Sequence, residues 1–151
     1  MSGSVPDFSV IEYKIQHLIG QGGFGKIYKV MKNDVFYVMK TLSASECSKY
    51  EERLFEKEAK LLFMVVGHPH IVKIEGYSSS NHSMLLEYLS FSFQLPEIDL
   101  PDTYNLKEFL IGCDSVDYFN QSQNLPQIVV SDLTRALSFL HKNDLVHRDL
   151  K

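Results

Sequence analysis

Short β-rich stretches separated by turn-forming residues fill the first half of the chain. They predict five strands, at residues 13–20, 26–31, 35–41, 71–77 and 84–88. A glycine-rich turn joins the first two strands, and Asn33-Asp34 joins the second strand to the third. Three strands connected by such short turns are most simply an antiparallel meander.

One long helix is predicted between the third and fourth strands, over residues 48–66. Ser48 and Glu51 have the S-x-x-E spacing of a capping box, and Gly67 followed by Pro69 is a typical stop signal. The apolar residues that recur at helical spacing, and so predict its buried face, are Leu54, Leu61 and Val65.

The pattern changes after Leu89. Residues 90–104 contain prolines and acidic residues and are predicted to form a loop, which a short helix follows at 106–111. A second long helix is predicted over residues 126–142, because Pro126 suits the first helical position. The apolar stripe of this helix is Val129, Leu133, Ala136, Leu137 and Leu140. Strands first and helices afterwards are typical of a two-lobed α+β protein.

Composition excludes several classes of function. The formal net charge of −4 argues against a general nucleic-acid binder, which needs a basic surface. The longest apolar run, residues 61–66, is far shorter than the ~20 residues that span a bilayer, so no membrane association is expected. The first residues carry no targeting signal, and the two separate cysteines, Cys47 and Cys113, are typical of a reducing compartment. We therefore expect a soluble cytoplasmic protein, with the nucleus as the alternative location.

The turn after the first strand has the pattern Gly20-x-Gly22-x-x-Gly25. Glycines let backbone N–H groups approach phosphate oxygens closely, where a Cβ would obstruct them. In a dinucleotide-binding fold such glycines lead into a helix. Here they lead into residues 26–30, which are too β-rich for a helix, so the glycines are predicted at a hairpin tip. A merely tight hairpin without a phosphate is the alternative interpretation.

Two opposite charges are predicted to meet between the third strand and the long helix. Strand alternation places Lys40 on one face together with Phe36 and Val38. Glu58 lies on the apolar stripe of the helix, where a carboxylate is costly to bury unless it is paired, and Lys40 is the partner that we expect. Taken alone, Lys40 could be an exposed edge charge and Glu58 could reach water.

The last five residues read His-Arg-Asp-Leu-Lys. Asp149, at the exit from a helix, can accept a proton from a substrate hydroxyl, and Lys151 can neutralise phosphate charge. In an arbitrary loop the same charges would simply be solvated.

These motifs together resemble the eukaryotic protein kinase family, over about residues 13–151. The glycine loop, the strand-3 lysine, the helix-C glutamate and the H-R-D-L-K catalytic loop occur in the family's order. The resemblance implies an N-lobe at about 13–89, with a five-stranded antiparallel sheet and helix C. The first helices of an incomplete helical C-lobe would follow at about 105–151, and residues 1–12 would be a loose lead-in.

The resemblance also implies roles for individual residues. Lys40 would hold the α- and β-phosphates of ATP and pair with Glu58, Asp149 would be the catalytic base, and Arg148 would meet an activation-loop phosphate. Lys151 would contact phosphate and favours Ser/Thr over Tyr substrates. The implied nucleotide-binding set is Ile19, Gly20, Gln21, Gly22, Gly23, Phe24, Gly25, Lys26, Ile27, Val38, Lys40, Leu86, Glu87 and Leu89, of which the last two lie with Tyr88 in the family's hinge.

The implied ligands are ATP, a protein substrate and Mg²⁺. The family's magnesium-binding Asn and Asp-Phe-Gly lie beyond Lys151, so we expect no metal ligand in this chain and incomplete catalysis. We also expect association through the apolar face of residues 126–142, which would otherwise be exposed. The alternative function is a non-catalytic truncated kinase that acts as a nucleotide-binding or docking module.

Overall fold

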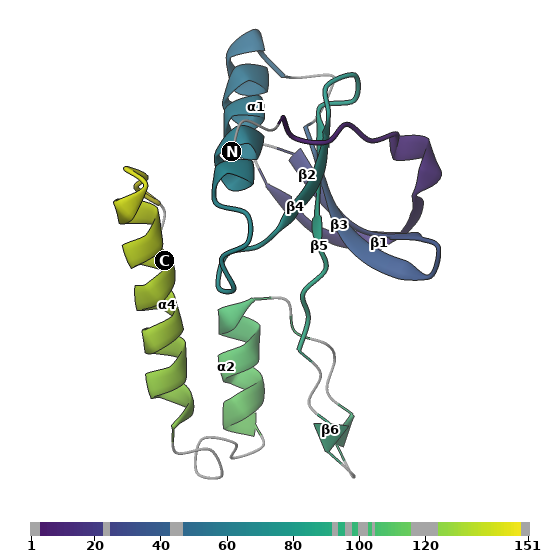
Figure 1. The fold of residues 1–151 in the computed structure, drawn as a ribbon. Helices are drawn as coiled ribbons and strands as arrows, with labels where there is room; N and C mark the ends of the chain where they lie inside the picture. The colour runs from purple at the N-terminus through teal and green to yellow at the C-terminus, as the bar shows by residue number, and fades with distance from the viewer. Residues whose placement is uncertain are drawn as a thin grey trace. The chain divides into compact units, whose positions relative to one another are not determined.

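The computed structural model describes residues 4–22, 25–42, 47–91, 94–95, 98–99, 103, 105–115 and 124–148. The chain divides into two compact units, Met1–Tyr88 and Leu89–Lys151 (Figure 1). The first unit holds a five-stranded sheet and one long helix. In its described residues, the second unit holds two helices and a short β-hairpin.

The sheet of the first unit is antiparallel throughout, and the five predicted strands and the meander of the first three are confirmed, although the fourth strand begins at Ile74 and not at residue 71. Its strands are β1 (Lys14–Gly22), β2 (Gly25–Lys32), β3 (Val35–Thr41), β4 (Ile74–Ser78) and β5 (Ser83–Glu87), in the spatial order β1-β2-β3-β5-β4. Asn33 and Asp34 form the predicted turn, and both have positive φ, as the tight turn of a two-residue hairpin requires.

Helix α1 (Lys49–Met64) follows β3 and begins with the predicted capping box. The Ser48 hydroxyl accepts from the Glu51 amide, and the Glu51 carboxylate accepts from the Ser48 amide. The Ser48 amide and hydroxyl both donate to the Glu51 carboxylate, which favours its charged form and lowers the pKa of Glu51 below its ordinary value. Just past the helix, Gly67 has φ +96°, a conformation that favours glycine.

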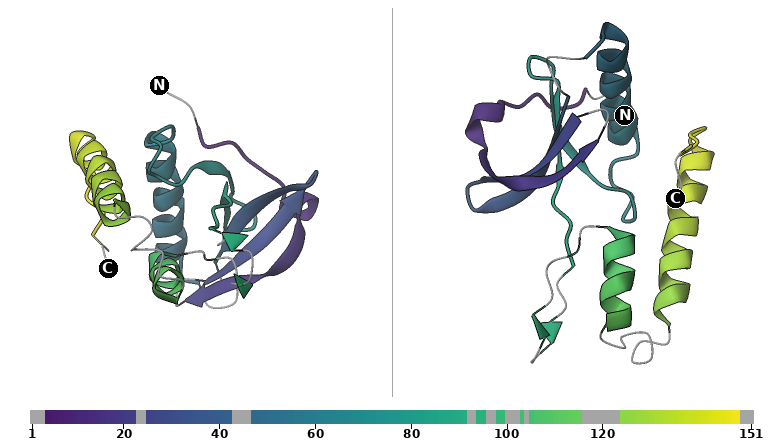
Figure 2. Two further views of the ribbon diagram at one scale, coloured as in Figure 1. Left: turned by 90° about the horizontal axis from the view of Figure 1, so that it is seen from below. Right: turned by 180° about the vertical axis from the view of Figure 1, so that it is seen from behind.

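The buried face of α1 is centred on Phe55 and Ala59, which differs from the predicted stripe. Val65 is buried as expected, but Leu54 is 43% exposed. Apolar side chains occur at adjacent helix positions, so the spacing allows two stripes about 100° apart around the axis. The helix turns the Phe55 stripe toward the sheet, where it packs with Leu42, Ile74 and Met84. Figure 2 shows the ribbon of α1 on one side of the sheet.

The opposite face of the sheet is covered by the start of the chain. Val30, Met39 and Leu85 form a second buried cluster, against which Phe8, Val10 and Tyr13 pack. Residues 6–12, here called the N-terminal strap, include the 3-10 helix η1 (Val10–Glu12). The described part of the predicted loose lead-in is therefore packed against the sheet, because its apolar side chains have a face to bury against.

The second unit contains β6 (Gln94–Leu95), β7 (Ile98–Asp99), α2 (Leu106–Ser115) and α4 (Leu125–Lys142). Strands β6 and β7 pair within the segment that was predicted to be a loop, and α2 continues past the predicted end at residue 111.

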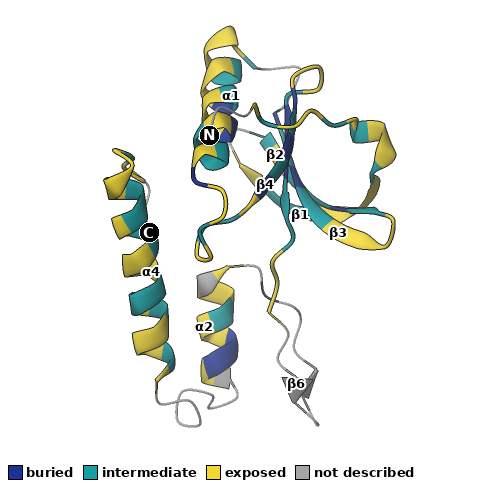
Figure 3. Ribbon diagram, viewed as in Figure 1, coloured by how far each residue is buried: buried dark blue, intermediate teal, exposed yellow. Residues whose placement is uncertain are grey.

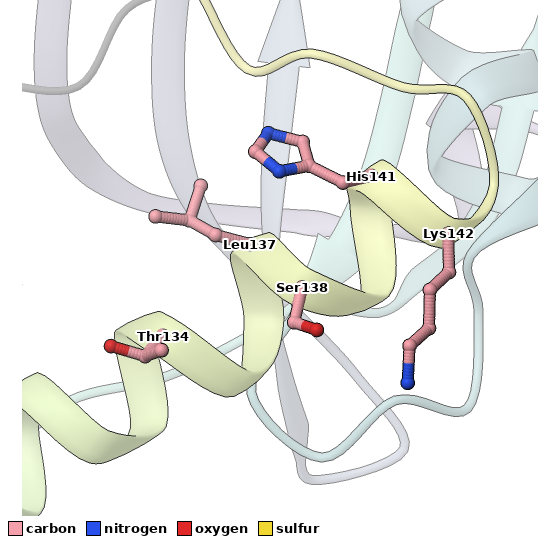
Figure 4. A pocket seen from close by; sticks show the side chains of 5 residues that line it. All are labelled: Thr134, Leu137, Ser138, His141 and Lys142. Atoms are coloured by element: carbon pink, nitrogen blue, oxygen red, sulfur yellow. The ribbon is translucent and has the colours of Figure 1, made fainter.

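No described residue of α4 is buried (Figure 3). A pocket on α4 is lined by Thr134, Leu137, Ser138, His141 and Lys142, whose side chains Figure 4 shows. In the described residues no helix has the length and apolar character needed to cross a membrane.

Candidate functional site

The strand register gathers one set of side chains on the sheet face that α1 covers. Ile27 is opposite Lys40, and Val38 lies between Lys29 and Leu86 on the neighbouring strands. Directly opposed residues of antiparallel strands share a face. Because Lys40 is also opposite Met84, which belongs to the core under α1, this set faces the helix side.

Lys40 and Glu58 form the predicted ion pair. The Lys40 Nζ donates to both carboxylate oxygens of Glu58, at 2.7 and 2.8 Å. The exposed fractions of the two side chains are 25% for Lys40 and 45% for Glu58. A pair this exposed contributes at most about 1 kcal/mol to stability. Its main physical effect is to fix the ammonium at one place, next to the ring of Phe55.

The glycines lie at the end of the β1–β2 hairpin, as predicted. Gly22 is opposite Gly25, and Gly20 is opposite Ile27, whose other partner is Lys40. A Cβ on Gly22 would meet nothing within 4 Å, so this stretch of backbone is open to a ligand. The glycines lead into a strand, which excludes the dinucleotide-binding βαβ arrangement. Gly23 and Phe24 lie outside the described residues.

Open glycine backbone beside a fixed ammonium fits a polyphosphate chemically. Backbone N–H groups and a lysine are the usual donors to phosphate oxygens, and Gly20, Gly22 and Lys40 lie toward one end of the sheet by register. Ile27 and Val38 supply apolar surface next to them, as a ring system requires. The donor set therefore fits a nucleoside triphosphate.

Comparison with known proteins agrees with this geometry. Residues 13–151 match the model of the protein kinase domain. The chain belongs to the protein kinase family. Similar proteins include serine/threonine-protein kinase SCH9 of Saccharomyces cerevisiae (29% identical over 93% of this chain), serine/threonine-protein kinase 33 of Mus musculus (26% over 92%) and serine/threonine-protein kinase ArnS of Sulfolobus acidocaldarius (29% over 94%). The chain spans only 16, 26 and 24% of the length of these three proteins, respectively.

The remaining predicted nucleotide-binding residues of this kinase domain lie on β1, β2, β5 and just beyond. Ile19 is half-buried at a register shift in β1, whereas Gln21 and Lys26 are exposed. Leu86 is half-buried. Leu89, which is exposed, begins the second unit.

Glu87 is held firmly to the residue that precedes β4. Its amide donates to the Lys73 carbonyl at 2.9 Å, and its Oε1 accepts from the Lys73 amide at 2.7 Å. The Glu87 carboxylate is therefore used to fix the backbone at Lys73.

The H-R-D-L-K motif at the end of the chain is described only in part. Arg148 takes a left-handed backbone conformation with φ 62°, which is uncommon for a residue with a side chain. Asp149 and Lys151 lie outside the described residues. Among the described residues, no three His, Cys, Asp or Glu side chains gather as a metal site would require.

One cluster at the site was not predicted. The Lys29 ammonium donates to the Tyr88 hydroxyl at 2.9 Å and lies over the rings of Phe36 and Tyr88. Strand alternation already placed Phe36 on the face of Lys40, and the same alternation applied to β2 places Lys29 beside Ile27. Strand alternation therefore predicts that Lys29 and Phe36 share a face of the sheet. It does not predict the contact of Lys29 with Tyr88, which is 59 residues away in the chain.

Proposed function

We propose that this kinase domain binds ATP and transfers its terminal phosphoryl group to serine or threonine hydroxyls of proteins. The observation that carries the proposal is the bidentate Lys40–Glu58 pair on the sheet face that also presents Ile27 and Val38. The serine/threonine preference is supported by the names of the similar proteins and by Lys151 in the H-R-D-L-K motif.

The first unit would hold the nucleotide. Lys40 would contact the α- and β-phosphates, and Glu58 would orient the ammonium toward them. The backbone of Gly20, Gly22 and Gly25 would donate N–H groups to phosphate oxygens. Ile27 and Val38 would cover the adenine ring, and the backbone of the hinge segment, residues 87–89, would hydrogen-bond its edge.

The residues of the catalytic loop would act on the substrate hydroxyl. Asp149 would accept its proton, and Lys151 would offset negative charge on the transferred group. When bound, ATP supplies the phosphoryl group and Mg²⁺ neutralises phosphate charge. Phosphoryl transfer depends mainly on positioning and electrostatic stabilisation, which is why a fixed ammonium is the central feature of this site.

The proposal is tested by ATP binding to the purified chain, measured by calorimetry. Lys40→Met should weaken binding by roughly 10- to 100-fold, because it removes charge-assisted hydrogen bonds to phosphate. Lys57→Met is the matched control, since Lys57 is an exposed lysine next to Glu58 in sequence, and it should leave affinity unchanged. A wild-type chain that binds no ATP, or an equal loss in both variants, would contradict the proposal.

Phosphate transfer is a separate measurement. Because the family's magnesium ligands lie beyond Lys151, we expect transfer to a serine peptide, and none to the matching tyrosine peptide, from a protein that carries this kinase domain together with those ligands. Nucleotide binding without any transfer would instead favour the alternative function, a non-catalytic nucleotide-binding module.

A further inference from the structure

A half-buried lysine on the nucleotide-facing side of the sheet is bound by aromatic groups instead of a carboxylate. The Nζ of Lys29 lies 4.2 Å from the ring centroid of Phe36 and 4.3 Å from that of Tyr88. It also donates to the Tyr88 hydroxyl at 2.9 Å, and the two rings are themselves 5.8 Å apart. Lys29 makes no ion pair with any carboxylate in the described part of the chain. We call these three residues the aromatic clamp.

The aromatic clamp joins three parts of the first unit. Lys29 comes from β2, Phe36 from β3, and Tyr88 is the residue that follows β5. A cation that lies over two aromatic rings is attracted by both. The hydrogen bond to the Tyr88 hydroxyl fixes where the Lys29 ammonium lies over the Tyr88 ring. The side chain of Tyr88 is thus fastened to the two strands that carry Ile27 and Val38.

The residue before Tyr88 is also fixed, by different bonds. Glu87 is bound to Lys73 through its amide and its carboxylate. Two consecutive residues of the hinge segment are therefore anchored, one to the start of β4 and one to β2 and β3. Backbone held in this way presents its N–H and C=O groups in a set geometry, which lowers the entropy lost when a ligand binds.

We propose that Lys29 is a positioning residue for adenine: by holding the Tyr88 side chain, it fixes the hinge backbone that meets the adenine edge. This inference rests on the proposed function, because it concerns the same nucleotide site. Lys29 acts through Tyr88 and contributes to recognition of the base.

The clamp lies away from the phosphate-binding end of the site. Along β3, Lys29 is opposite Val38, whereas Lys40 is opposite Ile27 and is therefore closer to the glycine turn. Glu58 and Lys40 contact each other without any member of the clamp. Loss of the clamp should therefore weaken binding of ATP but leave binding of a phosphate chain alone unchanged.

The test compares two ligands, ATP and inorganic tripolyphosphate, by calorimetry with the full chain. Lys29→Met should weaken ATP binding about three- to tenfold, the size expected for a lost cation–π contact and hydrogen bond. Affinity for tripolyphosphate should not change. Lys29→Arg, which keeps a cation and donors, should restore most of the ATP affinity.

Lys32→Met is the matched control. Lys32 lies on the same strand but on the other face, where it pairs with Glu12 and lies over the ring of Tyr13. The same substitution there should change neither affinity. Tyr88→Phe should weaken ATP binding less than Lys29→Met, because the ring remains, and the double variant Lys29→Met/Tyr88→Phe should be no weaker than Lys29→Met alone.

Each outcome has one interpretation. Unchanged ATP affinity in Lys29→Met would overturn the positioning role, and an equal loss for both ligands would also overturn it by indicating a general effect on folding. A wild-type chain that binds tripolyphosphate and ATP equally would overturn base recognition by this site. If the wild type binds neither ligand, the proposed function itself fails.

Discussion

Gly25 is the residue whose backbone most clearly excludes a side chain. Its φ is +140°, and a Cβ there would lie 1.9 Å from the Thr41 carbonyl oxygen. That oxygen belongs to the backbone of β3 and cannot move away cheaply. Gly25→Ala should therefore lower the free energy of unfolding by about 2–4 kcal/mol, measured by urea denaturation.

Gly22→Ala provides the comparison for Gly25→Ala. Gly22 is opposite Gly25 in the same hairpin, but a Cβ on it would meet nothing within 4 Å and its φ is not positive. We expect a change of less than about 1 kcal/mol in the free energy of unfolding. Equal destabilisation by the two substitutions would show that the positive φ of Gly25 and its contact with Thr41 do not limit which residue fits there.

Single residues differ in how well the sequence predicts their contacts. The pairing of Lys40 with Glu58 could be predicted from the sequence, because a lysine and a carboxylate on facing apolar surfaces are costly to bury unless they pair with each other. The pairing of Lys29 with Tyr88 could not, because a lysine near aromatic rings has many other partners available, water included. Only the register of β2 and β3 and the path of the chain after β5 bring these two side chains together.

Helix α1 shows how an element can be predicted while its orientation is not. The capping box and Gly67 predicted where it begins and ends, because both are local signals. Its rotation about its own axis depends on the surface that it meets. Phe55, which is 3% exposed, packs near Tyr77 of β4, whereas the neighbouring Leu54 is turned outward.

The rotation of α1 predicts unequal effects of two adjacent substitutions. Phe55→Ala should lower the free energy of unfolding by about 3–5 kcal/mol, because it leaves a cavity between helix and sheet. Leu54→Ala should change it by less than about 1 kcal/mol. Thermal or urea unfolding of the two variants measures both values. A larger loss for Leu54→Ala would mean that the predicted stripe, and not the Phe55 stripe, faces the sheet.

The short hairpin of β6 and β7 could not be predicted from the sequence. Each strand has two residues, too few for any alternation to be visible. The prolines and acids around them favour a loop. The five strands of the first unit were predictable because their turns, such as Asn33-Asp34, have residues that tolerate positive φ.

At the scale of the whole molecule, the N-terminal strap connects the start of the chain to β4, which lies about 70 residues later in the sequence. The whole strap precedes residue 13, where the match to the kinase family begins. Its Pro6 carbonyl nevertheless accepts a 2.8 Å hydrogen bond from the amide of Tyr77, on β4, which is an edge strand of the sheet. The strap thus covers backbone groups that would otherwise be open to pairing with another chain.

Gly76 makes room for the strap. A Cβ at this position would lie 3.0 Å from the Phe8 ring and 3.1 Å from the Pro6 carbonyl oxygen. Phe8 in turn makes an edge-to-face contact with Tyr13, whose ring meets Tyr37 in the same way. No local pattern predicts a contact between residues 8 and 76, because it requires the sheet to be assembled first.

Phe8→Ala should therefore loosen an edge strand about 70 residues away in the chain. We expect a loss of about 1–3 kcal/mol in the free energy of unfolding, since the ring is only half-buried and one aromatic contact disappears. The more specific readout is hydrogen exchange at the Tyr77 amide, which should become faster by roughly tenfold for each 1.4 kcal/mol of local protection lost. Ile11→Ala is the control in the same segment, because Ile11 is 93% exposed and should alter neither quantity. If the Tyr77 amide exchanged at an unchanged rate in Phe8→Ala, its bond to Pro6 would not depend on the strap being packed, and the strap would have to be regarded as a passive cover of the sheet.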